Sequence, residues 1–167
     1  MKTLIINGGT IEDAFALSYI ERVKPDCILA ADRGMEFCYR NQIKPDVILG
    51  DYDSADKTIL EAFRRQSGIE WHQYQPEKDY TDSEIAIGKA MERNSSEIHI
   101  LGGTGTRLDH VLGNIQLLMQ PLAKDIPCFL IDFHNRIRLL KARTILSKSQ
   151  QFGTYVSLLP LTTEVTG

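Results

Sequence analysis

Short apolar segments alternate with amphipathic segments along the first 134 residues of the chain. Segments such as CILAAD and DVILGD are hydrophobic at consecutive positions, which is typical of strands buried on both faces of a parallel sheet. The apolar segments predict six strands, at residues 3–7, 27–32, 46–51, 69–75, 97–103 and 127–133. The segments between them predict five helices, at residues 11–23, 35–42, 55–67, 81–94 and 109–124. This alternation predicts an α/β fold with a mostly parallel sheet and helices on both faces.

The pattern changes after Asn135, where RIRLLK, RTILSK and TYVSLLPL nearly alternate and no helical segment separates them. These segments predict a smaller antiparallel β unit. We therefore expect an α/β domain at residues 1–134 and a partial, apparently truncated β-sandwich domain at residues 135–167. Three strands without an evident closure bury little apolar surface on their own, so the second domain is expected to need further strands or a partner.

The amino-acid composition argues against several classes of protein. The chain is 43% hydrophobic and 25% charged, as in ordinary globular proteins. It has no apolar stretch of membrane-spanning length and no secretory signal at the N-terminus, so we expect a cytoplasmic protein with no membrane contact. The net charge of −3 argues against nucleic-acid binding. The three cysteines form no C-x-x-C pair, and we expect buried thiols rather than disulfides or a zinc site.

Polar or glycine-rich segments follow each of the first five predicted strands. Because ligands bind beyond the carboxyl ends of parallel strands, these segments are expected to share one functional rim. Together they combine aspartates with arginines and a lysine, a mixture that suits a divalent cation bound to a polyphosphate. Backbone N–H groups of the GGTGT segment would add donors for the same anion. The segments lie at residues 7–9, 32–34, 50–54, 76–82 and 102–110.

Each segment taken alone also fits a purely structural role. Thr81 with Glu84 matches a helix capping box, Asp109 could cap the last helix, and Asp32 with Arg33 could form a surface ion pair. The GGTGTR segment lacks the Lys-Ser/Thr of a Walker A loop and the third glycine of a dinucleotide-binding loop. His110 is interpreted as a residue near a helix start rather than a general base, and no Ser-His-Asp arrangement is evident.

Five segments, taken in order, resemble the thiamine pyrophosphokinase family: ADRG (31–34), GDYDS (50–54), KDYTDSE (78–84), GGTGTRLDHVLGN (102–114) and VSLLPLT (156–162). The resemblance implies a Rossmann-like α/β domain followed by a β-sandwich. It also implies Mg²⁺-dependent transfer of pyrophosphate from ATP to thiamine, giving thiamine diphosphate and AMP, by a homodimer whose active site is shared between subunits. Family members continue beyond the end of this sequence with strands that help to bind thiamine.

The resemblance also implies the roles of the rim residues. The expected Mg²⁺ ligands are Asp51, Asp53, Asp79 and Asp82, and Arg107 and Asp109 join these four as catalytic residues. Binding of the substrates is assigned to Asp32, Arg33, Ser54, Lys78, Thr81, Gly103, Thr104, Gly105, Arg107 and His110.

Three other functions remain open on the residues alone. A metal-dependent sugar-nucleotide transferase also uses a D-x-D pair. A phosphohydrolase could use an aspartyl nucleophile such as Asp51 after a strand. A non-enzymatic phospho-receiver or metabolite-binding domain would present the same acidic pocket without turnover.

Overall fold

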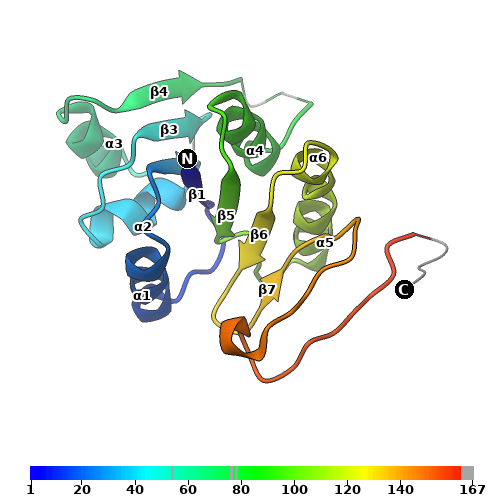
Figure 1. Cartoon of the computed structure of the whole chain (residues 1–167). Helices are drawn as coiled ribbons and strands as arrows, with labels where there is room; N and C mark the ends of the chain where they lie inside the picture. The colour runs from blue at the N-terminus through cyan, green and yellow to red at the C-terminus, as the bar shows by residue number, and fades with distance from the viewer. Residues whose placement is uncertain (54, 76, 78, 163–167) are drawn as a thin grey trace.

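The computed structural model describes residues 1–53, 55–75, 77 and 79–162. Its centre is one seven-stranded sheet with the order β4-β3-β2-β1-β5-β6-β7 (Figure 1). All neighbouring strands are parallel except β6 and β7, which are antiparallel. The strands are β1 (Lys2–Ile6), β2 (Cys27–Ala31), β3 (Val47–Gly50), β4 (Glu70–Gln73), β5 (Glu97–Leu101), β6 (Cys128–Ile131) and β7 (Arg136–Ile137).

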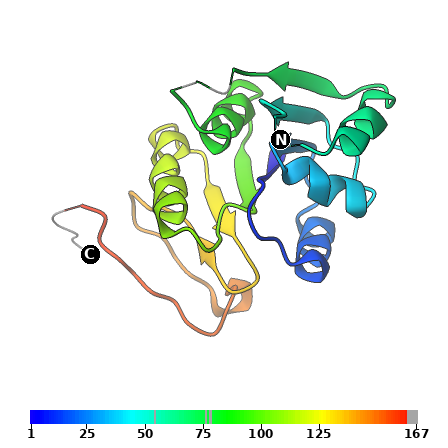
Figure 2. The same ribbon diagram turned by 180° about the vertical axis from the view of Figure 1, so that it is seen from behind.

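Helices cover both faces of this sheet, as the two opposite views show (Figures 1 and 2). Alternate residues of each strand point to opposite faces, so Ile5 packs with α4 while Leu4 and Ile6 pack with α1 and α2. The predicted fold class is confirmed. The helices are α1 (Asp13–Val23), α2 (Gly34–Arg40), α3 (Lys57–Arg64), α4 (Asp82–Glu92), α5 (Leu108–Leu117) and α6 (Met119–Ala123), with a short 3₁₀ helix, η1, at Lys148–Gln150.

The single helix expected at residues 109–124 is divided into α5 and α6. Pro121 lies one turn beyond Leu117 and has no N–H to donate to the carbonyl of that residue. The Leu118 N–H instead donates to the Ile115 carbonyl at 3.2 Å, which tightens the chain where α5 ends. No helix in the described part of the chain is both long enough and apolar enough to cross a membrane.

The antiparallel part of the fold begins with β7, which pairs Ile137 with Leu130 of β6. Between residues 138 and 162 the structure describes the 3₁₀ helix η1 and no further strand, so strands at 143–148 and 154–161 are not formed. Their apolar side chains lie in solvent, with Ile145 84% and Leu159 87% exposed. No neighbouring strand in the described chain accepts their backbone hydrogen bonds, which explains the difference. The division into two domains stays a prediction.

A buried hydrogen-bonded chain ties α1 to β5. The Tyr19 hydroxyl lies 2.7 Å from Nδ1 of His99, and Nε2 of His99 lies 2.7 Å from Glu97. With Glu97 ionised, His99 donates from Nε2 and accepts from Tyr19, so a neutral imidazole satisfies both partners. Burial lowers the pKa of His99 below its usual 6.5, although hydrogen bonding to Glu97 opposes the shift.

This chain predicts a pH dependence of stability. Because the folded-state pKa of His99 is depressed, the unfolded protein binds a proton first as the pH falls, and stability is lost as the pH drops below 6.5. We expect the melting temperature of the wild type to fall between pH 7 and pH 5, and His99→Phe in a Tyr19→Phe background to fall less. Thermal unfolding across this range measures the difference, and parallel curves would show that His99 does not contribute.

Candidate active site

The loops after β1 and β5 meet at the point where the strand order reverses. The Asn7 N–H donates to the Leu101 carbonyl at 2.9 Å, and the Gly9 N–H donates to the Gly102 carbonyl at 3.0 Å. A Cβ at Gly9 would lie 2.3 Å from the Gly102 carbonyl oxygen, and Gly102 has φ of +69°. Only glycine tolerates this approach and this backbone conformation. The two glycine loops therefore lie at the switch point of the sheet, where ligands of such folds bind.

The D-x-D pair forms a tight turn directly after β3. The Asp53 N–H donates to Oδ1 of Asp51 at 3.0 Å. Tyr52, between them, has φ of 64° and a buried side chain. Asp32 at the end of β2 lies alongside, since a Cβ at Gly50 would be 3.2 Å from its Cα. Asp51 is half-buried and Asp53 exposed, so the turn presents two carboxylates to the rim.

Asp79 and Asp82 flank Thr81 at the beginning of α4. Oγ1 of Thr81 accepts the Glu84 N–H at 3.2 Å, so the capping interpretation of Thr81 is confirmed. Nδ2 of Asn7 donates to Oγ of Ser83 at 2.8 Å and ties the first turn of α4 to the end of β1. This link brings the segment after β4 to the rim.

The GGTGTR loop follows β5 and leads into α5. Nδ2 of Asn114 donates to the Gly103 carbonyl at 2.7 Å and holds the loop from within the helix. Arg107 forms two hydrogen bonds to Asp109, at 3.3 and 2.7 Å, and this contact lowers the pKa of Asp109. Both side chains are about two-thirds exposed, at 68% and 66%. They are accessible to a ligand on the rim.

Arg33 and His110 lie at the same rim with different surroundings. Arg33 forms two hydrogen bonds with Glu36, at 3.0 and 3.2 Å, so its described ion pair is with Glu36 rather than with the preceding Asp32. His110 is exposed, and its Nε2 lies 3.9 Å from Asp109. Neither position excludes contact with a ligand.

The structure thus places the described site residues on one rim, from the ends of β2, β3 and β5 to the start of α4. It does not gather them into a ready-made metal centre: among the described residues, no three Asp, Glu, His or Cys side chains are close enough together to hold an ion. Ser54 and Lys78 lie outside the described residues. Their assigned roles stay predictions.

Sequence reasoning missed three polar residues that organise the rim: Asn7, Ser83 and Asn114. Each lies inside a segment that had been noted, namely NGG, TDSE and VLGN. Asn7 and Ser83 bond to each other although they are 76 residues apart, which no local spacing reveals, and Asn114 bonds to the Gly103 carbonyl of its own segment. The available signal is only that Asn7 and Asn114 are polar residues at positions that adjoin the core.

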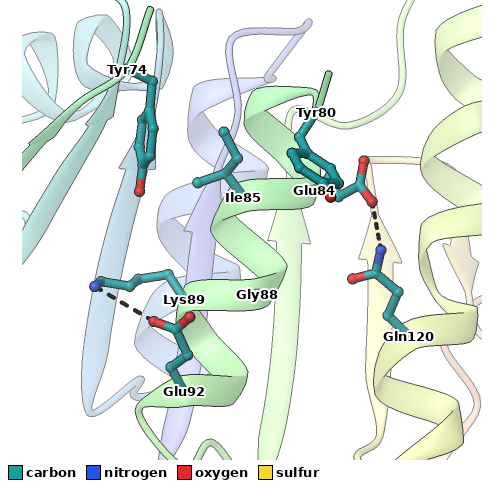
Figure 3. A pocket seen from close by; sticks show the side chains of 8 residues that line it. All are labelled: Tyr74, Tyr80, Glu84, Ile85, Gly88, Lys89, Glu92 and Gln120. Atoms are coloured by element: carbon teal, nitrogen blue, oxygen red, sulfur yellow. Dashed lines mark hydrogen bonds and ion pairs between the residues drawn. The ribbon is translucent and has the colours of Figure 1, made fainter. Parts of the chain in front are cut away.

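An open cavity of about 350 Å³ adjoins α4 on the side away from the sheet. Figure 3 shows Tyr74 and Tyr80 on either side of Ile85, with Gly88 on the helix below them. Glu84 accepts from Gln120 of α6 at 2.8 Å, and Lys89 pairs with Glu92 at 3.6 Å (Figure 3). The Glu84–Gln120 bond holds α4 against α6, whereas the Lys89–Glu92 pair lies within α4.

Comparison with known proteins identifies the family to which this chain belongs. The family model described as "Thiamin pyrophosphokinase, catalytic domain" matches residues 22–130, which include the described loops after β2, β3, β4 and β5. The chain belongs to the thiamin pyrophosphokinase family. The resemblance carried by the five sequence segments is thereby confirmed.

Relatives in this family agree in sequence and in fold. The thiamine pyrophosphokinase of Bacillus subtilis is 34% identical over 140 residues, which are 82% of this chain and 64% of that protein. A crystal structure of the Bacillus subtilis enzyme matches with a TM-score of 0.70 and 29% identity, over 83% of this chain and 63% of that one. The Geobacillus thermodenitrificans enzyme matches with a TM-score of 0.66 and 27% identity, over 81% and 61%. The chain therefore spans less than two thirds of the length of these relatives.

Because Arg107 is exposed, a substitution at this residue can distinguish a role in binding from a role in stability. Exposed ion pairs contribute little to stability, so we expect Arg107→Ala to leave the melting temperature nearly unchanged. We expect the same change to weaken binding of ATP at least about tenfold, because hydrogen bonds from a charged donor to phosphate are strong. Calorimetric titration with Mg²⁺ and ATP measures the affinity.

The matched control is Arg65→Ala, which removes an exposed ion pair with Glu61 at the far end of α3. It should change neither the melting temperature nor the affinity. An Arg107→Ala variant that melts early but binds ATP normally would assign Arg107 a structural role.

Proposed function

We propose that this chain performs the ATP-binding and catalytic part of a thiamine pyrophosphokinase reaction. In this reaction the hydroxyl oxygen of thiamine attacks the β-phosphorus of ATP. The bond from that phosphorus to the oxygen bridging to the α-phosphate breaks, and thiamine diphosphate and AMP are formed. The observation that carries the proposal is the D-x-D turn and the Arg107 loop on one rim, in a chain of this family.

The donor set of the rim fits Mg²⁺. Asp51, Asp53, Asp79 and Asp82 offer hard carboxylate oxygens, as this ion prefers. Mg²⁺ in nucleotide sites uses one or two carboxylates together with substrate phosphates and water, so the carboxylate pair of the D-x-D turn is sufficient for an ion that arrives with ATP. When bound, the ion would neutralise charge on the phosphate oxygens.

The other rim residues have roles that follow from their chemistry. Arg107, with the backbone N–H groups of Gly103, Thr104 and Gly105, would bind and orient the polyphosphate. Because this transfer needs chiefly positioning and charge stabilisation, such contacts would supply much of the rate. Asp32 and Asp109 would orient a substrate or accept the proton of the thiamine hydroxyl.

Four further residues complete the proposed site. Arg33 and Lys78 would contact phosphate oxygens as cations. Ser54 would add a hydroxyl beside the D-x-D turn, and His110 would contact a substrate at the start of α5. The assignments of Ser54 and Lys78 rest on the family resemblance of their segments.

The decisive test is AMP release from ATP, Mg²⁺ and thiamine, run beside ATP and Mg²⁺ alone. We expect AMP to depend on thiamine. We expect Asp51→Asn to lower kcat/KM at least about 100-fold, the order of loss when one preorganised charge-stabilising group is removed. Asp46→Asn is the matched control, since Asp46 is exposed just before β3, at the end of the sheet opposite the rim, where its side chain accepts the Ile28 N–H at 2.8 Å.

Other outcomes of the assay would contradict the proposal. Turnover of UDP- or GDP-sugars with none of ATP would favour a sugar-nucleotide transferase. An acyl-phosphate trapped on Asp51 would favour a phosphohydrolase, and nucleotide binding without turnover would favour a non-enzymatic domain. Membership of the family is the reason to rank thiamine pyrophosphokinase above these three.

We further infer that the protein acts as a homodimer in the cytoplasm, with the active site completed by residues 136–167 of a second copy. Exposed apolar side chains after β7 support this, including Ile145, Tyr155, Leu158 and Leu159. Leu108 and Leu112 on α5, beside the rim, are also exposed, at 69% and 54%. Large apolar side chains that are exposed on a protein favour contact with another protein surface.

Assembly is testable by light scattering on dilute protein with and without ATP, Mg²⁺ and thiamine. We expect a dimer mass, and a shift towards the monomer in Leu158→Asp, because a charge in an apolar interface is costly. The control is Leu17→Asp, since Leu17 is an exposed leucine on α1, away from the rim. A monomer mass for the wild type under both conditions would contradict the shared site.

A further inference from the structure

Two residues of the rim have an unusual backbone conformation. Within the described chain, six residues other than glycine have positive φ. Four of them, Lys24, Gln42, Asn94 and Asp125, follow the ends of helices, where a left-handed residue commonly terminates the helix. The remaining two are Asp32 and Tyr52, at the ends of β2 and β3. A bulky aromatic residue rarely adopts this conformation, so its surroundings must hold it there.

The Tyr52 side chain has contacts sufficient to do so. It is only 8% exposed, and its hydroxyl lies within hydrogen-bond distance of two carbonyl oxygens, Ile48 at 3.1 Å and His72 at 2.9 Å. Its ring meets the Trp71 ring edge-on, with 5.7 Å between the centroids.

We propose that Tyr52 is a positioning residue, whose buried side chain fixes the turn that carries Asp51 and Asp53 and aligns that turn with β4. The inference rests on the proposed function for its consequence in catalysis. It concerns a residue that need not touch either substrate. The inference is based on the difference in burial along the turn: the Tyr52 side chain is buried, whereas Asp51 is half-buried and Asp53 is exposed.

The contacts of Tyr52 join β3, which leads into the D-x-D turn, to β4, which precedes the second acidic segment. Its hydroxyl bridges the carbonyls of β3 and β4, and the Tyr74 N–H donates to the Gly50 carbonyl at 3.0 Å just beyond. The chain leaving β4 leads to Asp79 and Asp82. A side chain that sets the end of β3 against β4 therefore sets the D-x-D turn relative to the end of β4.

Space beside Tyr52 makes this support necessary. Its side chain lines an open cavity of about 450 Å³ together with Arg64, Trp71 and Gln73. If the ring is removed, the turn loses the support of this side chain, and its backbone can leave the left-handed conformation that Tyr52 now occupies. The Asp53 N–H would then lose its bond to Asp51, and the two carboxylates would no longer be held in one arrangement.

Three substitutions separate the elements of this argument. Tyr52→Phe keeps the ring and removes the hydroxyl. Tyr52→Leu removes both the ring and the hydroxyl and keeps an apolar residue. Tyr52→Gly removes the side chain but adopts φ near +64° without strain, so it tests whether the backbone conformation alone is sufficient. Tyr39→Leu is the matched control, because Tyr39 also meets an aromatic ring, Phe63, edge-on but lies on α2 away from the turn.

Two measurements report on positioning. One is the Mg²⁺ concentration that half-saturates ATP binding or turnover, and the other is the hydrogen-exchange rate of the Asp53 amide. We expect Tyr52→Leu and Tyr52→Gly to raise the Mg²⁺ midpoint at least about tenfold, as loss of a residue that orients metal ligands typically does, and to speed exchange at Asp53. Tyr52→Phe should retain most of the wild-type behaviour. Tyr39→Leu should lower the melting temperature without changing either measurement.

The inference is overturned if the Leu and Gly variants melt early but keep the wild-type Mg²⁺ midpoint and Asp53 exchange rate, because Tyr52 then only fills the core. It is also overturned if Tyr52→Gly alone behaves as wild type, because the backbone then suffices. Failure of the proposed function is distinguishable, since it appears as a wild type without thiamine-dependent AMP release. In that case exchange at Asp53 still decides whether Tyr52 holds the turn.

Discussion

Close packing of backbone at the ends of β1 and β5 is the constraint on which the rim depends. The Gly9 and Gly102 loops approach so closely that a methyl group on either would meet a carbonyl oxygen. This contact continues the parallel pairing of β1 and β5 past the last residue of each strand. It sets where the GGTGTR loop leaves the sheet, and so sets where Arg107 can reach. A larger residue at either glycine would separate the two loops.

Among the described residues, neutral hydrogen bonds also join other segments of the rim. Asn7 reaches Ser83 at the start of α4, Asn114 reaches the Gly103 carbonyl, and Tyr52 spans β3 and β4. Neutral links of this kind hold the segments without compensating the charges of the aspartates. The D-x-D turn itself is also held by a neutral donor, since the Asp53 N–H donates to the Asp51 carboxylate.

The two arginines of the rim form ion pairs with neighbouring carboxylates. Arg33 pairs with the half-buried Glu36, and Arg107 pairs with the exposed Asp109, and both arginine side chains are exposed. Such pairs cost little to break in water, so a polyphosphate with several negative charges can compete for the same guanidinium groups. The rim thus combines a closely packed backbone, neutral hydrogen bonds and ion pairs that a ligand can replace. This combination suits the binding of a charged substrate that carries a metal ion.

The sequence by itself determined the sheet, the helices on its two faces and the rim on which the polar segments lie. It could do so because strands buried on both faces must be apolar at consecutive positions, and parallel strands place their carboxyl ends together. The prediction of one helix at residues 109–124 was wrong because Pro121 has no N–H to donate to the Leu117 carbonyl, and the apolar pattern does not show this. The expected strands after residue 142 did not form, since alternation predicts a strand only where a neighbour completes its hydrogen bonds.

Only the tertiary structure decided how the rim is held. The partners of Asn7 and Tyr52 lie far from them along the chain, and the left-handed backbone of Tyr52 depends on contacts with β4. Sequence spacing carries no record of such contacts, because they arise when the strands align in the folded sheet. The residue types told us that a cation and a phosphate suit this rim, and the fold decided which side chains hold it in place.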